Sequence, residues 1–293
     1  YSELAMVDFN RVWVNGAYEE YTDENGIVVR KWDKDNQGND LKPSPIEQPE
    51  WCTHGLYDTN GYISGEMSIY LEAGQHTLTL LSMREPMLLR SITLSNHSRP
   101  AAYVDVKAAG DATGVSVRFE AENAVKTSSQ MLYPVQDQSS AVVYPMSARY
   151  LLNNSIGSSW KNAGQWIEWA FEVPQDGYYE ISMVDKQNFV RGIDVYRKIM
   201  IDGEVPFAEF NAQPFSYTQT WRIETLSDED GNAYRVYLTA GKHTLRMEVV
   251  LGDMANIIAQ VQDCVQQLNN IYRQVIYITG VAPDPVSYTH LTL

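Results

Sequence analysis

The stretch that organises the chain is Val236-Tyr-Leu-Thr-Ala-Gly-Lys-His-Thr-Leu-Arg-Met-Glu-Val249, because Ile69-Tyr-Leu-Glu-Ala-Gly-Gln-His-Thr-Leu-Thr-Leu80 nearly duplicates it. Around each copy apolar and polar residues alternate, as Leu245, Met247 and Val249 illustrate, and this is the period of a strand with one buried face. An Ala-Gly pair interrupts the alternation in each copy as a turn would. Each copy is therefore predicted to be a β-hairpin. A hairpin cannot bury its apolar face alone, so each copy is assigned to a separate sandwich or barrel.

The two copies are not equally complete. Tyr1 aligns with Phe207, so nothing in the first copy corresponds to residues 118–206 of the second. The predicted fold is all-β, with two β-sandwiches of which the first is incomplete at its N-terminus. The predicted divisions are a partial sandwich over residues 1–97, a linker over 98–114, a complete sandwich over 115–285, and a non-native tail over 286–293 that resembles a translated sequencing adaptor.

One segment of the second copy departs from the β pattern. Between residues 253 and 273 apolar side chains recur at spacings of three and four, which predicts an amphipathic helix with one apolar stripe. The stripe consists of Ile257, Ile258, Val261, Cys264, Val265, Leu268 and Tyr272. We expect it to pack on the sandwich or on a neighbour, and we expect residues 275–279 to form the last strand.

Composition restricts the partners of the chain. The net charge of −15 and the pI near 4.7 argue against nucleic acid or an anionic membrane, since both attract clustered Lys and Arg. A neutral ligand or a divalent cation is compatible with this charge. The segment 33–40 has the polar composition of a solvated loop. Cys52 and Cys264 lie in different predicted domains and are read as free thiols.

Catalytic motifs are absent from the sequence. It contains five scattered histidines, no Gly-x-Ser-x-Gly elbow and no Gly-rich phosphate loop, so the chain is predicted not to be an enzyme. His76 and His243 occupy the same place in the two copies of the repeat. This indicates packing or a turn hydrogen bond, because a catalytic pair is not expected to be duplicated in this way.

Three motifs occur in a shared order: Phe119-Glu-Ala-Glu-Asn123, Trp160-Lys-Asn-Ala-Gly-Gln-Trp-Ile-Glu-Trp169 and Val173-Pro-Gln-Asp-Gly-Tyr-Tyr179. Together they resemble the galactose-binding-like β-sandwich of carbohydrate-binding modules, with families six and thirty-five the nearest. The resemblance covers about 119–280, and 1–95 as a partial second copy. Residues 201–207 and the helix also resemble modules found beside solute-binding domains in large bacterial envelope proteins. The resemblance implies jelly-roll-like sandwiches and an extracellular or cell-surface location.

In such modules a sugar is held in loops at one edge of the sandwich. An aromatic ring contacts the apolar face of the sugar, and amides bind its hydroxyls. The resemblance thus implies a ligand site built from Trp160, Asn162, Asn188, Arg191, Tyr144 and Tyr150. Two alternatives stay open at this point. Trp160 can instead cap the core, and Arg191 can pair with Asp185 or Asp194.

Glu120 and Glu122 match the acidic pair that helps hold a structural calcium ion in related modules. A late-strand aspartate commonly completes that shell, and residues 275–279 contain none. The alternative is that the two glutamates are strand residues facing water.

The sequence therefore predicts a non-catalytic carbohydrate-binding tandem module of a larger extracellular glycan-handling protein. Its expected partners are a glycan or oligosaccharide and a neighbouring domain of the parent protein, with no nucleic acid and no membrane insertion. The alternative is a structural or protein-interaction sandwich that docks a neighbouring solute-binding or catalytic domain through the helix at 253–273.

Overall fold

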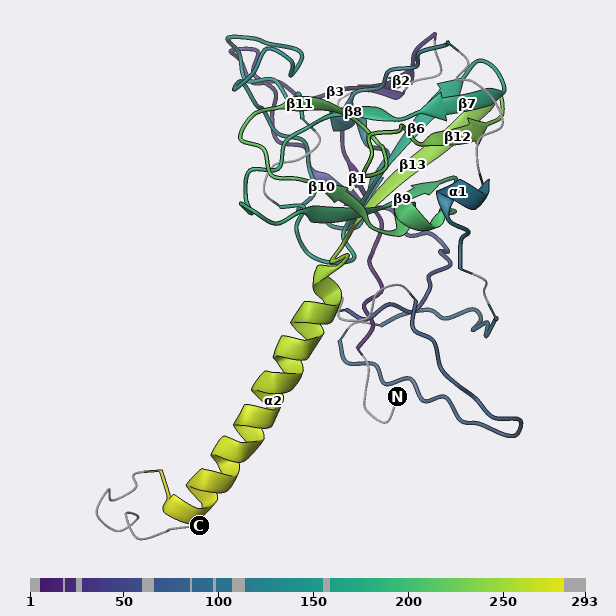
Figure 1. Ribbon diagram of the computed structural model, residues 1–293. Helices are drawn as coiled ribbons and strands as arrows, with labels where there is room; N and C mark the ends of the chain where they lie inside the picture. Colours follow the sequence, from purple (N-terminus) through teal and green to yellow (C-terminus); the bar gives the residue numbers. More distant parts are fainter. Residues whose placement is uncertain are drawn as a thin grey trace.

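The computed structural model describes residues 6–17, 19–24, 28–59, 66–84, 86–96, 99–106, 114–154 and 159–281. These residues form a mostly β, sandwich-like body from which one long helix projects (Figure 1). The all-β prediction is confirmed at this coarse level.

The larger sheet has seven strands in the order β10-β9-β13-β6-β5-β1-β4, and every neighbouring pair is antiparallel. Its strands are β1 (Trp13–Asn15), β4 (Pro45–Glu47), β5 (Lys126–Thr127), β6 (Trp166–Val173), β9 (Val195–Ile201), β10 (Gln213–Phe215) and β13 (Gly241–Val250). β13 lies between β6 and β9, with Leu245 opposite Trp169 on one side and Ile201 on the other. This strand is the end of the repeated stretch, and it carries the centre of the core.

The second layer consists of two short strand pairs. β12 (Arg235–Leu238) pairs with β7 (Gly177–Glu180), and β11 (Arg222–Thr225) pairs with β8 (Ser182–Asp185). Alternate residues of both layers are buried against one another, as the alternating sequence pattern predicts. The resulting core includes Ile167, Trp169, Phe171, Ile199, Phe207, Phe210, Leu226, Val236, Leu238, Leu245 and Met247.

Smaller elements complete the chain. They are the hairpin of β2 (Glu19–Thr22) and β3 (Val28–Lys31), the short helix α1 (Tyr103–Val106), the two single-turn helices η1 (Ala121–Asn123) and η2 (Ala208–Asn211), and the long helix α2 (Met254–Thr279). Residues 115–120 form no strand and lead directly into η1. Within the predicted linker, Tyr103 packs on Phe207 and Tyr234 with ring centroids 4.8 and 4.9 Å apart.

The prediction of a hairpin over 236–249 is wrong. β12 pairs with β7 and β13 pairs with β6 and β9, so the Ala240-Gly241 turn carries the chain from one layer of the sandwich to the other. Alternating burial is the same for a strand in a hairpin and a strand that crosses between layers, so the pattern does not reveal which strand is the partner.

The first copy of the repeat keeps the turn but not the strands. No strand occurs in the described parts of 66–96 beyond a single bridge at Glu66, and the side chains of 69–80 are exposed. His76 Nε2 nevertheless lies 2.8 Å from Glu72 O, and His243 Nε2 lies 2.7 Å from Thr239 O. The expected turn hydrogen bond is thus confirmed in both copies.

Residues of the first predicted domain extend the sheet of the second. β1 pairs with β5 through Trp13 and Thr127, and β4 pairs with β1. We expected residues 1–97 to form a sheet of their own, but β1 and β4 belong to the seven-stranded sheet. The division into 1–97 and 115–285 as two folding units stays a prediction, and the predicted tail 286–293 lies outside the described residues.

The predicted helix is confirmed, but its extent and packing differ from expectation. α2 continues to Thr279, so residues 275–279 are helical and not a strand. Ala255 is its one buried residue, and Figure 1 shows the helix pointing away from the sandwich. Of the two expected partners of the stripe, the sandwich is therefore wrong, and the neighbour stays a prediction. Within the described part of the chain, no helix is long and apolar enough to span a membrane.

Candidate ligand-binding site

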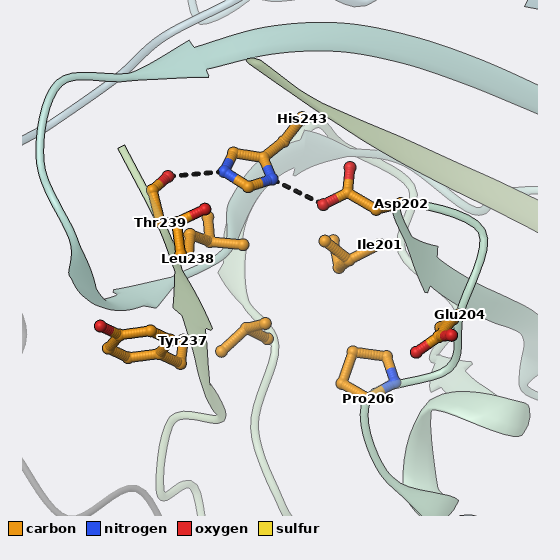
Figure 2. Close-up of a pocket in the computed structure, with 9 residues that line it drawn as sticks. Ile201, Asp202, Glu204, Pro206, Tyr237, Leu238, Thr239 and His243 are labelled. Carbon is orange, nitrogen blue, oxygen red and sulfur yellow. Dashed lines mark hydrogen bonds and ion pairs between the residues drawn. The ribbon is translucent and has the colours of Figure 1, made fainter. Parts of the chain in front are cut away.

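An open pocket of about 290 Å³ lies at the end of the sandwich where β9 and β12 finish and β13 starts. Figure 2 shows that its residues come from the turn after β9 and from the crossing between β12 and β13. The lining residues are Ile201, Asp202, Glu204, Pro206, Val236, Tyr237, Leu238, Thr239 and His243. An apolar lining with a few polar groups is the usual composition of a small-molecule site.

The turn at Asp202 shapes one wall of the pocket. Asp202 has a φ of 52°, a left-handed conformation that Asp tolerates better than most residues. Its Oδ1 accepts a hydrogen bond from Thr244 N at 2.8 Å, and its Oδ2 lies 2.6 Å from His243 Nδ1. The carboxylate side chain is still 48% exposed, so it can also accept hydrogen bonds from a ligand.

His243 forms the top of the pocket and is fully engaged in hydrogen bonds (Figure 2). Its Nδ1 faces the Asp202 carboxylate and its Nε2 faces Thr239 O, and both partners are acceptors. Burial lowers the pKa of His243, but the hydrogen bonds to Thr239 and Asp202 outweigh burial and raise it. The imidazolium form satisfies both partners, which leaves neither ring nitrogen free to take a proton from a substrate.

Tyr237 lies on β12 at the edge of the pocket, and its exposed ring points outward, away from Asp202 and Glu204 (Figure 2). Its side chain is 54% exposed because it points outward from β12, between buried Val236 and Leu238. Tyr178 on the paired strand β7 supports it edge-on at 5.4 Å between ring centroids. Neither Tyr237 nor Asp202 was predicted from the sequence as a site residue. The signal that could have found them is the histidine at the same position in both copies of the repeat, His76 and His243, because it marks this turn.

The loops that carry the sequence-predicted site residues gather at the other end of the sheet. Gly164 N donates to Val249 O at the end of β13, and the loop with Asn188 and Arg191 leads into β9. Lys186 Nζ, just after β8, forms an ion pair with Asp137 at 2.7 Å. This contact holds the loop that carries Tyr144 and Tyr150 against the end of β8. The structure thus brings the three loops to one end of the sandwich, opposite the pocket.

Trp160 closes the core at this end. Its Nε1 donates to Gln165 O at 3.1 Å, and its ring meets Trp169 edge-on at 6.5 Å between centroids. The guanidinium of Arg197 lies over the ring at 4.3 Å and donates to Trp160 O. These contacts favour the core-capping alternative, because Arg197 already occupies a face of the indole.

Arg197 is a residue that the sequence analysis missed. Burial lowers its pKa to about 10, and no described residue forms an ion pair with it. Its Nη1 donates to Tyr196 O, whereas its Nε finds no hydrogen-bond partner among the described residues. The guanidinium is therefore held mainly by backbone carbonyls and by the Trp160 ring.

The remaining predicted residues are exposed. Asn162 donates its backbone N–H to Gln165 Oε1 and leaves its own amide in solvent. Asn188 and Arg191 stand in a loop whose shape is held by the buried amide of Gln187, which bonds the backbone of residues 189, 190 and 193. Asp185, one suggested partner of Arg191, pairs with Arg222. Tyr144 and Tyr150 are 65% and 45% exposed.

The two predicted calcium ligands lie at the start of η1, and the calcium site stays a prediction. The Glu120 carboxylate accepts a hydrogen bond from Arg118 Nε at 2.8 Å. Burial, assisted by the charge of Glu120, raises the pKa of Glu122 to about 7. In the residues that the structure describes, no three His, Cys, Asp or Glu side chains are grouped to hold a metal.

Comparison with known proteins gives matches among solved structures. No family model and no curated protein matches the chain. A Paenibacillus sp. cycloisomaltooligosaccharide glucanotransferase complexed with cycloisomaltoheptaose is 22% identical at a TM-score of 0.33, over 48% of this chain and 17% of that chain. A ruminal GH26 endo-β-1,4-mannanase is 16% identical at 0.28, over 44% and 22%. A Podospora anserina GH26-CBM35 β-(1,4)-mannanase is 14% identical at 0.28, over 44% and 23%.

The chain spans less than a quarter of the length of each of these solved proteins. TM-scores of this size leave the fold family and the activity unassigned.

Proposed function

We propose that this chain is a non-catalytic carbohydrate-binding module that holds a glycan at the pocket of Asp202 and Glu204, with the exposed ring of Tyr237 beside it. The observation that carries the proposal is an exposed, supported tyrosine ring on the outer face of β12, next to a pocket whose walls combine apolar and carboxylate groups. A sugar ring has an apolar face of C–H groups and a rim of hydroxyls, so it needs this mixture.

The chemistry of each wall fits a neutral sugar. The hydroxyls of a sugar residue in the pocket donate to Asp202 and Glu204, and the C–H face of a neighbouring residue of the same glycan stacks on the outward ring of Tyr237. The volume of about 290 Å³ is at the small end for ligand pockets and suits one or two sugar residues. Since the pocket is open, a longer oligosaccharide can extend beyond it.

The absence of catalysis is part of the proposal. Hydrolysis of a glycoside needs a carboxylic acid and a second carboxylate on opposite sides of the scissile bond. In the pocket, Asp202 is committed to His243 and Thr244, and His243 has no free nitrogen. The groups present are therefore better suited to binding and orientation than to proton transfer.

The finer parts of the proposal follow from the resemblance noted in the sequence. We infer a jelly-roll-like module of the family six or thirty-five type, in a larger protein at the cell surface or outside the cell. The glycan-binding loops of that resemblance, with Tyr144, Tyr150, Asn162, Asn188 and Arg191, form a second place where the same function can reside.

The test is a glycan array followed by calorimetry with the best ligand. We expect Tyr237→Ala to weaken binding about tenfold or more, which corresponds to about 1.4 kcal/mol. The melting temperature should change little, because the ring is exposed in the free protein.

Tyr144→Ala is the matched control, since it removes an equally exposed ring at the opposite end of the sheet. Loss of affinity in Tyr144→Ala alone would move the site to the loops. A chain that binds no glycan on the array contradicts the proposed function, and the protein-interaction alternative then takes its place.

A further inference from the structure

Helix α2 carries an apolar face that the sandwich leaves uncovered. The helix has 26 residues, and Ala255 is the only one of them that is buried. Leu268 and Ile278 are 65% and 70% exposed, and Ile257, Val261, Ile271 and Val275 are exposed as well. An apolar stripe of this length on a projecting helix marks an interaction surface.

The spacing of the stripe identifies the geometry of its partner. Its residues are separated alternately by three and four positions without interruption: Met254, Ile257, Val261, Cys264, Leu268, Ile271, Val275 and Ile278, which we name the heptad stripe. A strict repeat of seven keeps one face directed at another helix that winds around it in a left-handed supercoil. The complementary surface is therefore a second helix with the same repeat.

We propose that the heptad stripe binds the heptad stripe of a second copy of this chain, with the two helices antiparallel. Charge does not oppose this pairing, because α2 carries only Asp263 and Arg273, and both lie away from the stripe and its flanks. Partner helices of different sequence are commonly selected by charges in the flanking positions. The neutral flanks of α2 accept an identical helix.

The flanks decide the orientation. One flank of the stripe is apolar, with Ile258, Val265 and Tyr272, and the other is polar, with Gln260, Gln267 and Gln274. In an antiparallel pair each flank meets the like flank of its partner, so apolar groups meet apolar groups and amides can bond to amides. In a parallel pair every glutamine would face an apolar side chain.

The register follows from the same positions. Cys264 opposite Leu268 of the second copy also places Met254 opposite Ile278, so the whole heptad stripe overlaps. The antiparallel arrangement further holds the two sandwiches at opposite ends of a pair about 39 Å long, by the rise of 1.5 Å per residue. This separation exceeds the screening length of about 8–10 Å in physiological salt, which matters because each chain carries a net charge of −15.

The mass of the full chain in solution tests the pairing. We expect a dimer by light scattering, and we expect Leu268→Glu to yield a monomer, because it places a carboxylate at the centre of the helix pair. Gln266→Glu is the matched control, since it adds the same charge two residues away on the opposite face. It should remain dimeric. The unchanged melting of the sandwich in Leu268→Glu would show that the variant is folded.

Disulfide formation tests the orientation in a Cys52→Ser background, since both native thiols are free and exposed. One variant keeps Cys264, and the other carries Cys264→Ala with Leu268→Cys. In the antiparallel pair neither variant cross-links with itself, but a mixture of the two does. Self-linking of either variant would overturn the antiparallel arrangement.

A full chain that is monomeric at every concentration, or a dimer that Gln266→Glu disrupts as much as Leu268→Glu does, would overturn the proposal. A monomer would leave the heptad stripe to a neighbouring domain. None of these outcomes depends on whether the pocket binds a sugar, because α2 lies at the other end of the sandwich from the pocket.

Discussion

Glu122 connects the burial of a single carboxyl group to the pH dependence of folding. Its pKa is raised to about 7 by burial, whereas an exposed glutamate has a value near 4.5. The folded state therefore binds the proton more tightly than the unfolded state. The resulting stabilisation is complete below about pH 4.5 and is lost as the pH rises through about 7.

We expect the free energy of unfolding to fall by on the order of 2 kcal/mol from about pH 5 to pH 8 through this group. Glu122→Gln, which cannot ionise, should remove this slope in denaturant titrations at several pH values. Calcium bound to an ionised Glu122 would lower its pKa and flatten the slope in the parent protein. Equal slopes with EDTA and with calcium would thus count against the predicted metal site, and a slope that calcium abolishes would establish it.

Single residues also show how far the sequence could define the candidate site. The repeat identified His243 as a turn residue, because its hydrogen bond to Thr239 is local and is copied by His76. The sequence could not identify Tyr237 as a pocket residue, since the pocket depends on β12 and the turn after β9 meeting across two layers. Trp160 was ambiguous for a related reason, as Arg197 reaches it from a distant strand.

Among the elements, the turn at 35–39 fixes the position of a distant loop. Asp40 is buried, and its Oδ2 accepts a hydrogen bond from Leu152 N at 2.9 Å while its own N–H donates to Tyr150 O at 2.7 Å. Lys34 pairs with the same carboxylate. The segment predicted as a solvated loop is therefore a connector between the first 60 residues and the loop that carries Tyr150.

We expect Asp40→Ala to destabilise the chain by about 1–3 kcal/mol, because it leaves the buried Leu152 N–H without an acceptor. Chemical denaturation measures the change, and hydrogen exchange should be faster at residues 150–152. Asp33→Ala is the matched control, since Asp33 is exposed and its side chain is not part of this contact. Equal effects of the two substitutions would contradict the connector role.

Elements with long, regular patterns were predictable and those set by distant partners were not. α2 and strands β6, β7 and β8 follow from local periodicity. Residues 275–279 were mistaken for a strand because their β-branched side chains favour one, although Val275 and Ile278 continue the heptad spacing of α2. Residues 69–80 resemble the sequence of β12 and β13, but within the described chain no strand pairs with them.

In the molecule as a whole, the first 60 residues contact the seven-stranded sheet both at its edge, through β1, and on its outer face, through Glu50 and Tyr57. Asn15 Nδ2 donates to Leu132 O at 3.1 Å, and Lys198 Nζ donates to the Tyr57 hydroxyl at 2.7 Å. The outer face of β6, β9 and β13 includes buried Trp166, Glu168 and Lys198. The covering segment excludes water from these charged groups, so each needs a partner: Glu168 pairs with Arg246, and Lys198 donates to the Tyr57 hydroxyl.

This cover alters the expectation for separate fragments. Because β1 and β4 are part of the larger sheet, a fragment of residues 115–281 would expose the edge of β5 and lose the contacts to Lys198 and Leu132. We expect it to melt below the full chain, by about 2–4 °C for each kcal/mol of lost stabilisation. Residues 1–97 added separately should restore part of the difference, since a free sheet edge accepts a matching strand. The contrary result is a fragment that melts at the same temperature as the full chain and does not respond to added 1–97. It would show that residues 1–97 and 115–281 fold as independent units although they share a sheet.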